Sequence, residues 1–241
     1  MIGMTVAEKE SKPTLVLVHG AWHGRWAWDP LLPFLRQAGI PVLAVQLPGI
    51  GRGPGEHDLA GHAAFLRAEL QATTGPVVVC GHSYGGAVVT EAAAGLDNVK
   101  GLVYVAAFMV DVGESCVDAN VPAPVLPDPT LGTVREGDYL RVPAAAATQM
   151  FYGDCTPQQA RTAIAGLTPE HVKTVSTPVT RAAWREIPST YVVCENDNAI
   201  LAHVQTRMAR RAKRSLVMDS AHSPMLSRPR ELATLLTQAV G

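Results

Sequence analysis

Short apolar segments alternate with helix-like segments along much of the chain, and this alternation is what most constrains the fold. The apolar segments are rich in β-branched residues and continuously apolar, which is typical of strands covered on both faces of a sheet. The strand candidates are Thr14–Val18, Pro41–Val45, Val77–Cys80, Gly101–Ala107, Thr190–Cys194 and Ser215–Met218. The helix candidates are Trp28–Ala38, Asp58–Ala72, Ser83–Gly95, Ile200–Ala212 and Pro229–Val240. This order predicts an α/β fold with a mostly parallel, doubly wound sheet of about six strands, and ligand sites at the carboxyl ends of the strands.

The alternation breaks between Asp111 and Ile187, where prolines accumulate in VPAPVLPDPT and RVPAAAATQM. A segment of this length is too long for a structureless loop inside a compact domain. Helical pieces are expected at Tyr139–Tyr152, Thr156–Gly166 and Thr168–Val175. We therefore predict one domain, with a core of residues 1–110 and 188–241 and an inserted helical cap of residues 111–187 that has no core of its own.

Composition and charge exclude several classes of protein. With 47% apolar and 17% charged residues in 241, the chain can bury a core, and its net charge of −1 provides no basic surface for nucleic acid. The start, MIGMTVAEKESKP, lacks the apolar stretch of a signal peptide, and residues 101–110 are too few to span a membrane. The four cysteines show no CxxC motif and no disulfide-like spacing. We expect a cytoplasmic enzyme or binding protein without nucleic-acid or membrane partners.

No pattern in the sequence predicts a metal or a nucleotide cofactor. The eight histidines are scattered and form no HExxH motif. The glycine-rich segment 49–55 lacks both G-x-G-x-x-G before a helix and the lysine of a phosphate-binding loop. We therefore expect no cofactor.

The segment VVVCGHSYGGAVV, residues 77–89, contains the motif G-x-S-x-G between a predicted strand and a predicted helix. In that context the serine lies on a sharp, strained turn that exposes its hydroxyl above the sheet. Gly81 and Gly85 are small because neighbouring backbones come close at such a turn. The alternative is a tight turn whose serine only caps the helix. The context favours Ser83 as a catalytic nucleophile.

A serine hydroxyl needs a base to take its proton, and the expected chain order is Ser, Asp, His. His222 follows the last predicted strand, where its imidazole can reach back to Ser83. His203 competes but lies in a predicted helix, where a surface position is expected. His82 is adjacent to the nucleophile but is expected to point into packing. We predict His222 as the base.

The acid has two candidates. Asp197 follows the strand Thr190–Cys194, and Asp111 follows Gly101–Ala107; either strand end could supply the carboxylate. Glu195 and Asp219 are nearby alternatives. Asp197 could also cap the helix that follows it. We favour Asp197 and leave Asp111 open.

The oxyanion of a tetrahedral intermediate needs two backbone N–H donors. One is the amide of Tyr84, directly after the nucleophile, and the other comes from the loop after the first strand. In that loop Gly20 allows a tight turn and Ala21 is the predicted donor. We place Gly20 and Trp22 at the substrate pocket, and we expect His19 to hold the loop structurally.

With these residues in place, the chain resembles an α/β-hydrolase of the branch that holds plant methyl esterases, hydroxynitrile lyases and small bacterial relatives. The segments that carry the resemblance are LVLVHGAWHGRWAW (15–28), GHSYGG (81–86), VYVAAFMVD (103–111), YVVCENDNAI (191–200) and AHSPMLSRPREL (221–232). The resemblance implies a triad of Ser83, Asp197 and His222 with the amides of Ala21 and Tyr84 as oxyanion donors. It therefore favours Asp197 over Asp111.

The sequence departs from the lyases of this branch at two positions. Those lyases carry a threonine after the histidine that ends the first strand and a lysine directly after the catalytic histidine. Gly20 and Ser223 stand there in this chain. Without the lysine, cyanide would lack its stabilising cation, so the resemblance implies an esterase.

The sequence thus predicts a serine hydrolase that cleaves a carboxylic ester of a small or medium lipophilic substrate through an acyl-enzyme. The cap composition, rich in Ala, Pro and Val, suggests the lipophilic pocket. A ligand-binding protein or a non-hydrolytic lyase or cyclase on the same scaffold is the alternative. The expected partner is a small-molecule ester, and a homodimer is left open.

Overall fold

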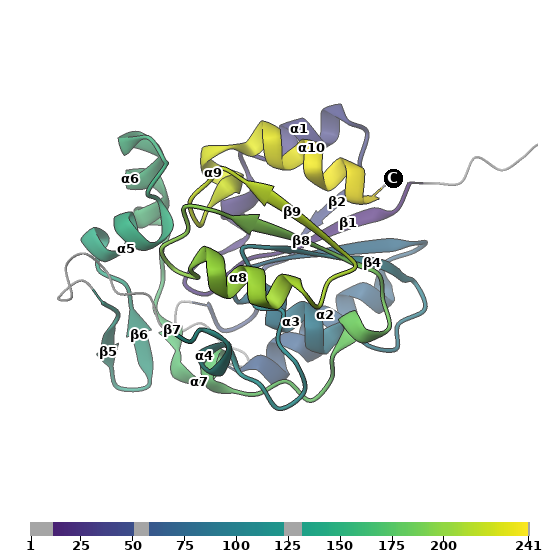
Figure 1. Cartoon of the computed structure of the whole chain (residues 1–241), viewed down its shortest axis with the longest axis horizontal. Helices are drawn as coiled ribbons and strands as arrows, with labels where there is room; N and C mark the ends of the chain where they lie inside the picture. The colour runs from purple at the N-terminus through teal and green to yellow at the C-terminus, as the bar shows by residue number, and fades with distance from the viewer. Residues whose placement is uncertain (1–11, 51–57, 123–131, 241) are drawn as a thin grey trace, which may run out of the picture.

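A six-stranded parallel sheet lies at the centre of the structure, a computed structural model that describes residues 12–50, 58–122 and 132–240. The strand order is β2-β1-β3-β4-β8-β9, and every neighbouring pair is parallel (Figure 1). The bounds are β1 Thr14–Val18, β2 Val42–Ala44, β3 Val77–His82, β4 Val99–Val105, β8 Ser189–Cys194 and β9 Arg214–Met218. The predicted α/β arrangement with a parallel sheet of about six strands is confirmed.

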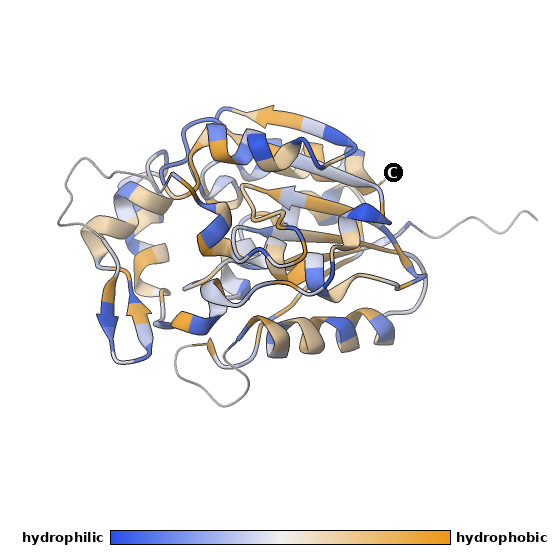
Figure 2. Cartoon of the chain, turned by 60° about the horizontal axis from the view of Figure 1, so that its bottom comes forward, coloured by the Kyte–Doolittle hydropathy of each residue, from blue (hydrophilic) through white to orange (hydrophobic). Residues whose placement is uncertain are grey.

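Helices cover both faces of this sheet. On one face lie α1 (Leu32–Gln37) and α10 (Pro229–Val240); on the other lie α2 (Leu59–Ala72), α3 (Gly85–Ala92) and α8 (Ala202–Ala209) (Figure 1). Successive residues of a strand point to opposite faces, so Leu15 and Leu17 of β1 enter one core cluster while Val16 and Val18 enter the other. In Figure 2 hydrophobic residues follow the central strands, and hydrophilic residues interrupt the surrounding helices. Burial on both faces explains why the strands are continuously apolar.

Several element boundaries differ from the sequence prediction. The helix predicted from Trp28 is a 3-10 turn, Arg25–Trp28, followed by the shorter α1, because Pro30 and Pro33 lack the N–H that a continuous helix requires. Strand β4 ends at Val105 rather than Ala107, because Ala106 adopts a positive φ of 44°. The predicted N-cap Asp58 is confirmed, since its carboxylate accepts a hydrogen bond from the Gly61 amide at 2.9 Å.

The predicted cap contains a small sheet as well as helices. Strands β5 (Val134–Glu136), β6 (Tyr139–Arg141) and β7 (Glu170–His171) form an antiparallel sheet. The helices are α4 (Cys116–Ala119), α5 (Ala144–Phe151), α6 (Pro157–Ala165) and α7 (Val172–Ser176), with a 3-10 turn at Ala183–Arg185. Figure 1 shows the small sheet with α5 and α6 beyond the arrowheads of β8 and β9.

The helix predicted from Tyr139 is wrong at its start, because Gly137, at a φ of 63°, turns the chain so that β6 pairs with β5. The helix predicted from Thr168 is likewise preceded by β7, and α7 begins only at Val172. The division into core and cap stays a prediction, and we use the word cap for residues 111–187.

Three features named from the sequence lie outside the described residues: the N-terminal segment 1–11, most of the glycine-rich segment, and prolines within 123–131. In the ranges that are described, no helix is both long and apolar enough to cross a membrane.

Candidate active site

Ser83 lies at a sharp turn between β3 and α3. Its φ is 53°, in the left-handed region, which is unusual for a residue with a Cβ. The turn brings backbones so close that a Cβ on Gly81 would lie 2.6 Å from the Gly85 carbonyl oxygen. A Cβ on Gly85 would lie 2.5 Å from the carbonyl oxygen of Val18, at the end of β1. The chain therefore has the strained turn expected for a presented serine, at the carboxyl end of β3.

Asp197 and His222 are joined by a buried hydrogen bond. The Nδ1–H of His222 donates to Oδ2 of Asp197 at 2.7 Å, and their side chains are 1% and 0% exposed. The other carboxylate oxygen, Oδ1, accepts from the amides of Ala199 at 2.7 Å and Ile200 at 2.9 Å. With its proton fixed on Nδ1, the His222 ring presents a lone pair on Nε2, as a general base requires.

Gln205 on α8 completes the surroundings of Asp197, and sequence reasoning missed it. Its side-chain amide donates to Asp197 Oδ2 at 2.8 Å, while its own oxygen accepts from the Cys194 amide at 3.0 Å. Gln205 is fully buried. A polar residue on the inner side of a predicted helix was the only signal for it in the sequence. Gln205 thus ties the position of Asp197 to the end of β8.

The loops of the nucleophile and the base are held together through His82. Its Nε2–H donates to the backbone oxygen of His222 at 2.8 Å, and the two rings lie 4.7 Å apart between centroids. The Ser83 hydroxyl and the His222 ring make no direct hydrogen bond among the described contacts. Catalytic hydrogen bonds often tighten only when substrate binds. The structure brings Asp197 and His222 into contact and anchors the loop of His222 beside Ser83.

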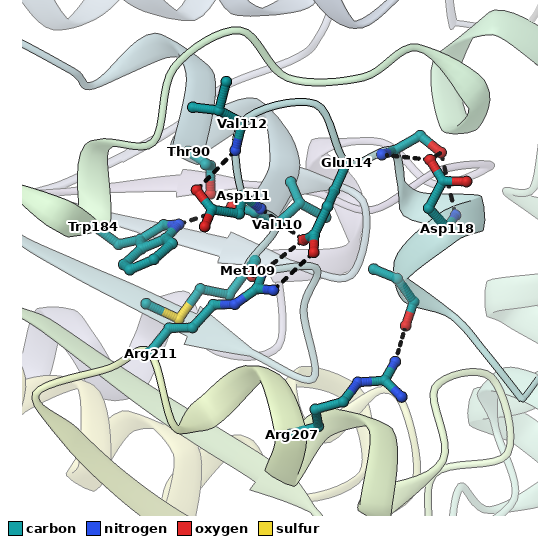
Figure 3. Close-up of polar contacts among 12 residues, drawn as sticks. Thr90, Met109, Val110, Asp111, Val112, Glu114, Asp118, Trp184, Arg207 and Arg211 are labelled. Carbon is teal, nitrogen blue, oxygen red and sulfur yellow. Dashed lines mark hydrogen bonds and ion pairs between the residues drawn. The ribbon is translucent and has the colours of Figure 1, made fainter.

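Asp111, the competing acid, lies in a separate polar cluster. Its carboxylate pairs with Arg185 at 2.7 Å, and Figure 3 shows it beside Glu114, Arg211 and Trp184. Arg211 binds Glu114 at 2.7 Å and the Met109 carbonyl at 2.7 Å. These contacts hold the segment after β4, and none of them reaches His222. His203, Glu195 and Asp219 are exposed.

Two buried backbone amides face no acceptor among the residues that the structure describes. Ala21 and Tyr84 are 3% and 1% exposed, and their N–H groups donate to no other group among the described residues. Buried amides without a partner are rare in folded proteins. Tyr84 also precedes α3, whose N-terminal end carries partial positive charge. The arrangement fits the predicted oxyanion donors.

Two buried histidines, both neutral, hold the loop after β1 in place. His19 donates from Nδ1 to the Gly20 carbonyl and accepts on Nε2 from the Leu47 amide. His23 donates from Nδ1 to the Ala21 carbonyl at 2.8 Å and accepts from the Tyr152 hydroxyl at 2.8 Å. Burial lowers the pKa of His19 to about 4 and the pKa of His23 to about 3. These contacts agree with the predicted structural role of His19.

We expect the free energy of unfolding to fall as the pH drops below about 6.5, the pKa of an unfolded histidine. Each histidine stays neutral in the folded state, so only the unfolded state binds a proton in this window, which extends to about 4 for His19 and about 3 for His23. The slope approaches about 1.4 kcal/mol per pH unit for each histidine. Urea unfolding at several pH values measures it.

His23→Gln provides the specific comparison. The glutamine amide can donate to the Ala21 carbonyl and accept from Tyr152, but it does not titrate. The variant should therefore show a shallower pH slope than the parent protein. Equal slopes in His23→Gln and the parent protein would contradict the assignment.

A cavity of about 260 Å³ opens beside Ser83. Its lining is mostly apolar and includes Trp22, Phe108, Met150, Phe151 and Ile200, together with Ala21 and Tyr84. Trp22, predicted at the substrate pocket, is among the residues that line this cavity. Gly20, also predicted there, lies against the nucleophile, where a Cβ would come 2.9 Å from Ser83 Cβ. Its lack of a side chain makes room for Ser83, and the place of both residues at the substrate pocket stays a prediction.

The family follows from comparison with known proteins. A sequence profile of the alpha/beta hydrolase family matches residues 15–235. The chain belongs to the α/β hydrolase family. This α/β hydrolase is 31% identical to the alpha/beta hydrolase nvfD of Aspergillus novofumigatus, over 95% of its length and 97% of the relative.

The resemblance to plant methyl esterases is also confirmed. This α/β hydrolase is 26% identical to methyl jasmonate esterase 1 of Vitis vinifera, over 93% of its own length and 95% of the relative. The crystal structure of polyneuridine aldehyde esterase superposes with a TM-score of 0.81 at 21% identity, over 95% of this chain and 99% of that one. The structural match supports the fold.

Proposed function

We propose that this α/β hydrolase cleaves a carboxylic ester of a small or medium lipophilic substrate through an acyl-enzyme on Ser83. The observation that carries the proposal is the buried hydrogen bond between His222 and Asp197, anchored beside a serine on a strained turn. The amides of Ala21 and Tyr84, which have no acceptor among the described residues, supply the donors that an oxyanion needs. These are the parts that acyl transfer requires.

The class of enzyme is that of its relatives. The chain is a carboxylic ester hydrolase, a class to which several relatives named esterases belong. The triad, the substrate and the reaction steps are the proposal.

In the proposed mechanism Ser83 Oγ attacks the ester carbonyl carbon while His222 Nε2 takes the hydroxyl proton. The C=O pair moves onto oxygen, where the amides of Ala21 and Tyr84 stabilise it. Asp197 holds the imidazole tautomer and stabilises the imidazolium. Collapse of the intermediate expels the alcohol, which receives the proton from His222. Water, activated by His222, then attacks the acyl-enzyme, releases the acid and restores Ser83.

The lining of the cavity supports a lipophilic substrate. A cavity of about 260 Å³ with a mostly apolar wall excludes water from the ester and offers few polar contacts. The proposed partner is therefore a small-molecule ester. The cytoplasmic location and the homodimer stay predictions.

Replacing Ser83 with Ala tests the proposal. The variant should lose hydrolysis of p-nitrophenyl acetate by at least about 1,000-fold, because no nucleophile remains to form the acyl-enzyme. It should also no longer react with a fluorophosphonate probe, which the parent enzyme binds covalently. Circular dichroism controls for folding. Full activity in Ser83→Ala would refute the acyl-enzyme and leave binding or lyase chemistry on this scaffold.

A further inference from the structure

The residue that follows the proposed oxyanion donor is bound by the cap at three points. The backbone N–H of Trp22 donates to Glu170 Oε2 at 3.1 Å, and its carbonyl accepts from the Thr168 amide at 3.0 Å. The indole Nε1–H donates to the Leu140 carbonyl at 2.9 Å. Leu140 and Glu170 are directly opposite each other in the pairing of β6 with β7. The small sheet of the cap therefore provides a docking edge for the loop after β1.

This loop is strained where the cap holds it. Trp22 has a φ of 63°, a left-handed conformation that is strained for a residue with a side chain. Such a conformation persists only where surrounding contacts enforce it. The hydrogen bonds that Trp22 donates to Glu170 and Leu140 and accepts from Thr168 supply that constraint.

The peptide plane between Ala21 and Trp22 is held at both ends. Its N–H donates to Glu170, and its C=O accepts from Nδ1 of His23 at 2.8 Å. The N–H of Ala21, the proposed oxyanion donor, belongs to the preceding peptide plane, which is joined to this one at the Ala21 Cα. Fixing this plane therefore fixes the direction in which the Ala21 N–H can point.

Glu170 is built into the structure as an acceptor. It is 3% exposed, and its second oxygen, Oε1, accepts from the hydroxyl of Thr174 at 2.9 Å, one turn further along the chain. Thr174 is itself fully buried. A buried carboxylate needs hydrogen-bond donors, and the Trp22 amide and the Thr174 hydroxyl are two of them. Glu170 is not among the residues that line the cavity, so it contacts the loop and not the substrate.

We propose that Glu170 is a positioning residue that holds the Ala21 amide in the oxyanion hole by binding the Trp22 backbone. The inference rests on the proposed function, since it assigns a partner to one of the proposed oxyanion donors. It makes the oxyanion hole dependent on the cap, because β7 carries Glu170. A donor that is held in advance stabilises the transition state without reorganisation.

Three variants test the hydrogen bond. In Glu170→Met, which keeps the size but removes the acceptor, kcat should fall about 10- to 100-fold with KM within about twofold, because a misplaced donor acts on the transition state. Glu170→Gln should restore most of that kcat, since its amide oxygen can accept from Trp22 and its NH2 can donate to the Thr174 hydroxyl. Thr174→Val is the matched control, which removes the hydrogen bond from the Thr174 hydroxyl to Glu170 and leaves the Trp22 bond.

Affinity for a trifluoromethyl ketone separates positioning from general destabilisation. The ketone forms a tetrahedral adduct on the serine whose oxyanion needs the same donors, so its affinity should fall in proportion to kcat in Glu170→Met but not in Thr174→Val. Melting temperatures are measured alongside. Where Glu170→Met does not fold, Glu170→Asp withdraws the acceptor by one methylene and should show the same loss to a smaller degree.

An unchanged kcat in Glu170→Met would overturn the positioning role. So would a Thr174→Val variant that loses as much kcat and ketone affinity as Glu170→Met does. Ser83→Ala is measured beside these variants. An active Ser83→Ala would mean that the proposed function has failed, whereas an inactive Ser83→Ala with an unchanged Glu170→Met would mean that only the role of Glu170 has failed.

Discussion

Asp197→Asn is expected to lower kcat about 10⁴-fold while changing KM little. The amide oxygen of the new side chain should take the place of Oδ1, which accepts from the backbone amides of Ala199 and Ile200. The NH2 group must then face His222, where the carboxylate accepted the Nδ1 proton at 2.7 Å. Nδ1 becomes an acceptor and the proton moves to Nε2, so the imidazole can no longer take the proton of Ser83. The expected fall in kcat comes from the wrong imidazole tautomer and not from weaker substrate binding.

Gln205 strengthens this expectation. Its side-chain NH2 donates to the same oxygen of Asp197 at 2.8 Å, so two donors would face each other in Asp197→Asn. A buried donor without an acceptor costs about 1–3 kcal/mol, which should appear as a lower free energy of unfolding in urea. The loss of activity should exceed what this destabilisation explains. With a free energy of unfolding of about 5–15 kcal/mol, most of the variant stays folded at about 25 °C.

Asp111→Asn is the matched control for the choice between the two acids. Asp111 pairs with Arg185, and its side chain is 26% exposed. We expect its kcat on p-nitrophenyl acetate to stay within about twofold of the parent value, as for most surface substitutions away from the site. A large loss in Asp111→Asn together with an active Asp197→Asn would reverse the assignment of the acid.

The sequence predicted those parts of the site that depend on local patterns. The sharp turn at Ser83 follows from G-x-S-x-G between strand and helix, because only small flanking residues allow the backbones to approach. His222 and Asp197 follow from their places after the last two strands, since parallel strands end at the same edge of the sheet. The strand bounds of β1 match the prediction because its apolar run is sharply limited on both sides.

The parts that were missed depend on contacts between distant segments. Glu170 approaches Trp22 only because β7 pairs with β6, and short strands within a cap leave little periodicity in the sequence. Gln205 is an ordinary polar helix residue until α8 packs against the end of β8. Both side chains form hydrogen bonds with backbone groups of other segments. Such bonds require no particular residue type nearby in the chain, so no sequence motif marks them. They could be found only from the fold.

Gly85→Ala should be strongly destabilising and should also impair catalysis. A Cβ at this position would lie 2.5 Å from the carbonyl oxygen of Val18 and 2.7 Å from that of His19. Both are backbone atoms at the end of β1, so no side-chain rotation can relieve the contact. Overpacking of this kind costs about 3 kcal/mol where the backbone must shift, or a fall in Tm of about 6–12 °C for a chain of this length.

The catalytic part of the effect follows from which backbone has to move. His19 is two residues before Ala21, so relief of the contact displaces the loop that carries the proposed oxyanion donor. A shift of about 1 Å in a catalytic group can cost about 100-fold in rate, so kcat of the folded fraction should fall by about that factor. Thermal melting and active-site titration with a fluorophosphonate separate the lost folded protein from the lower kcat.

Gly132→Ala serves as the control, because a Cβ there would meet no atom of the described residues within 4 Å and the backbone has no positive φ. That variant should keep its melting temperature and its kcat. Should Gly85→Ala also retain both, the close approach of α3 to β1 would not be what shapes the turn. Loss of stability with an unchanged kcat would mean instead that the end of β1 shifts without moving Ala21. The loop after β1 would then be held in place mainly by its contacts with the cap.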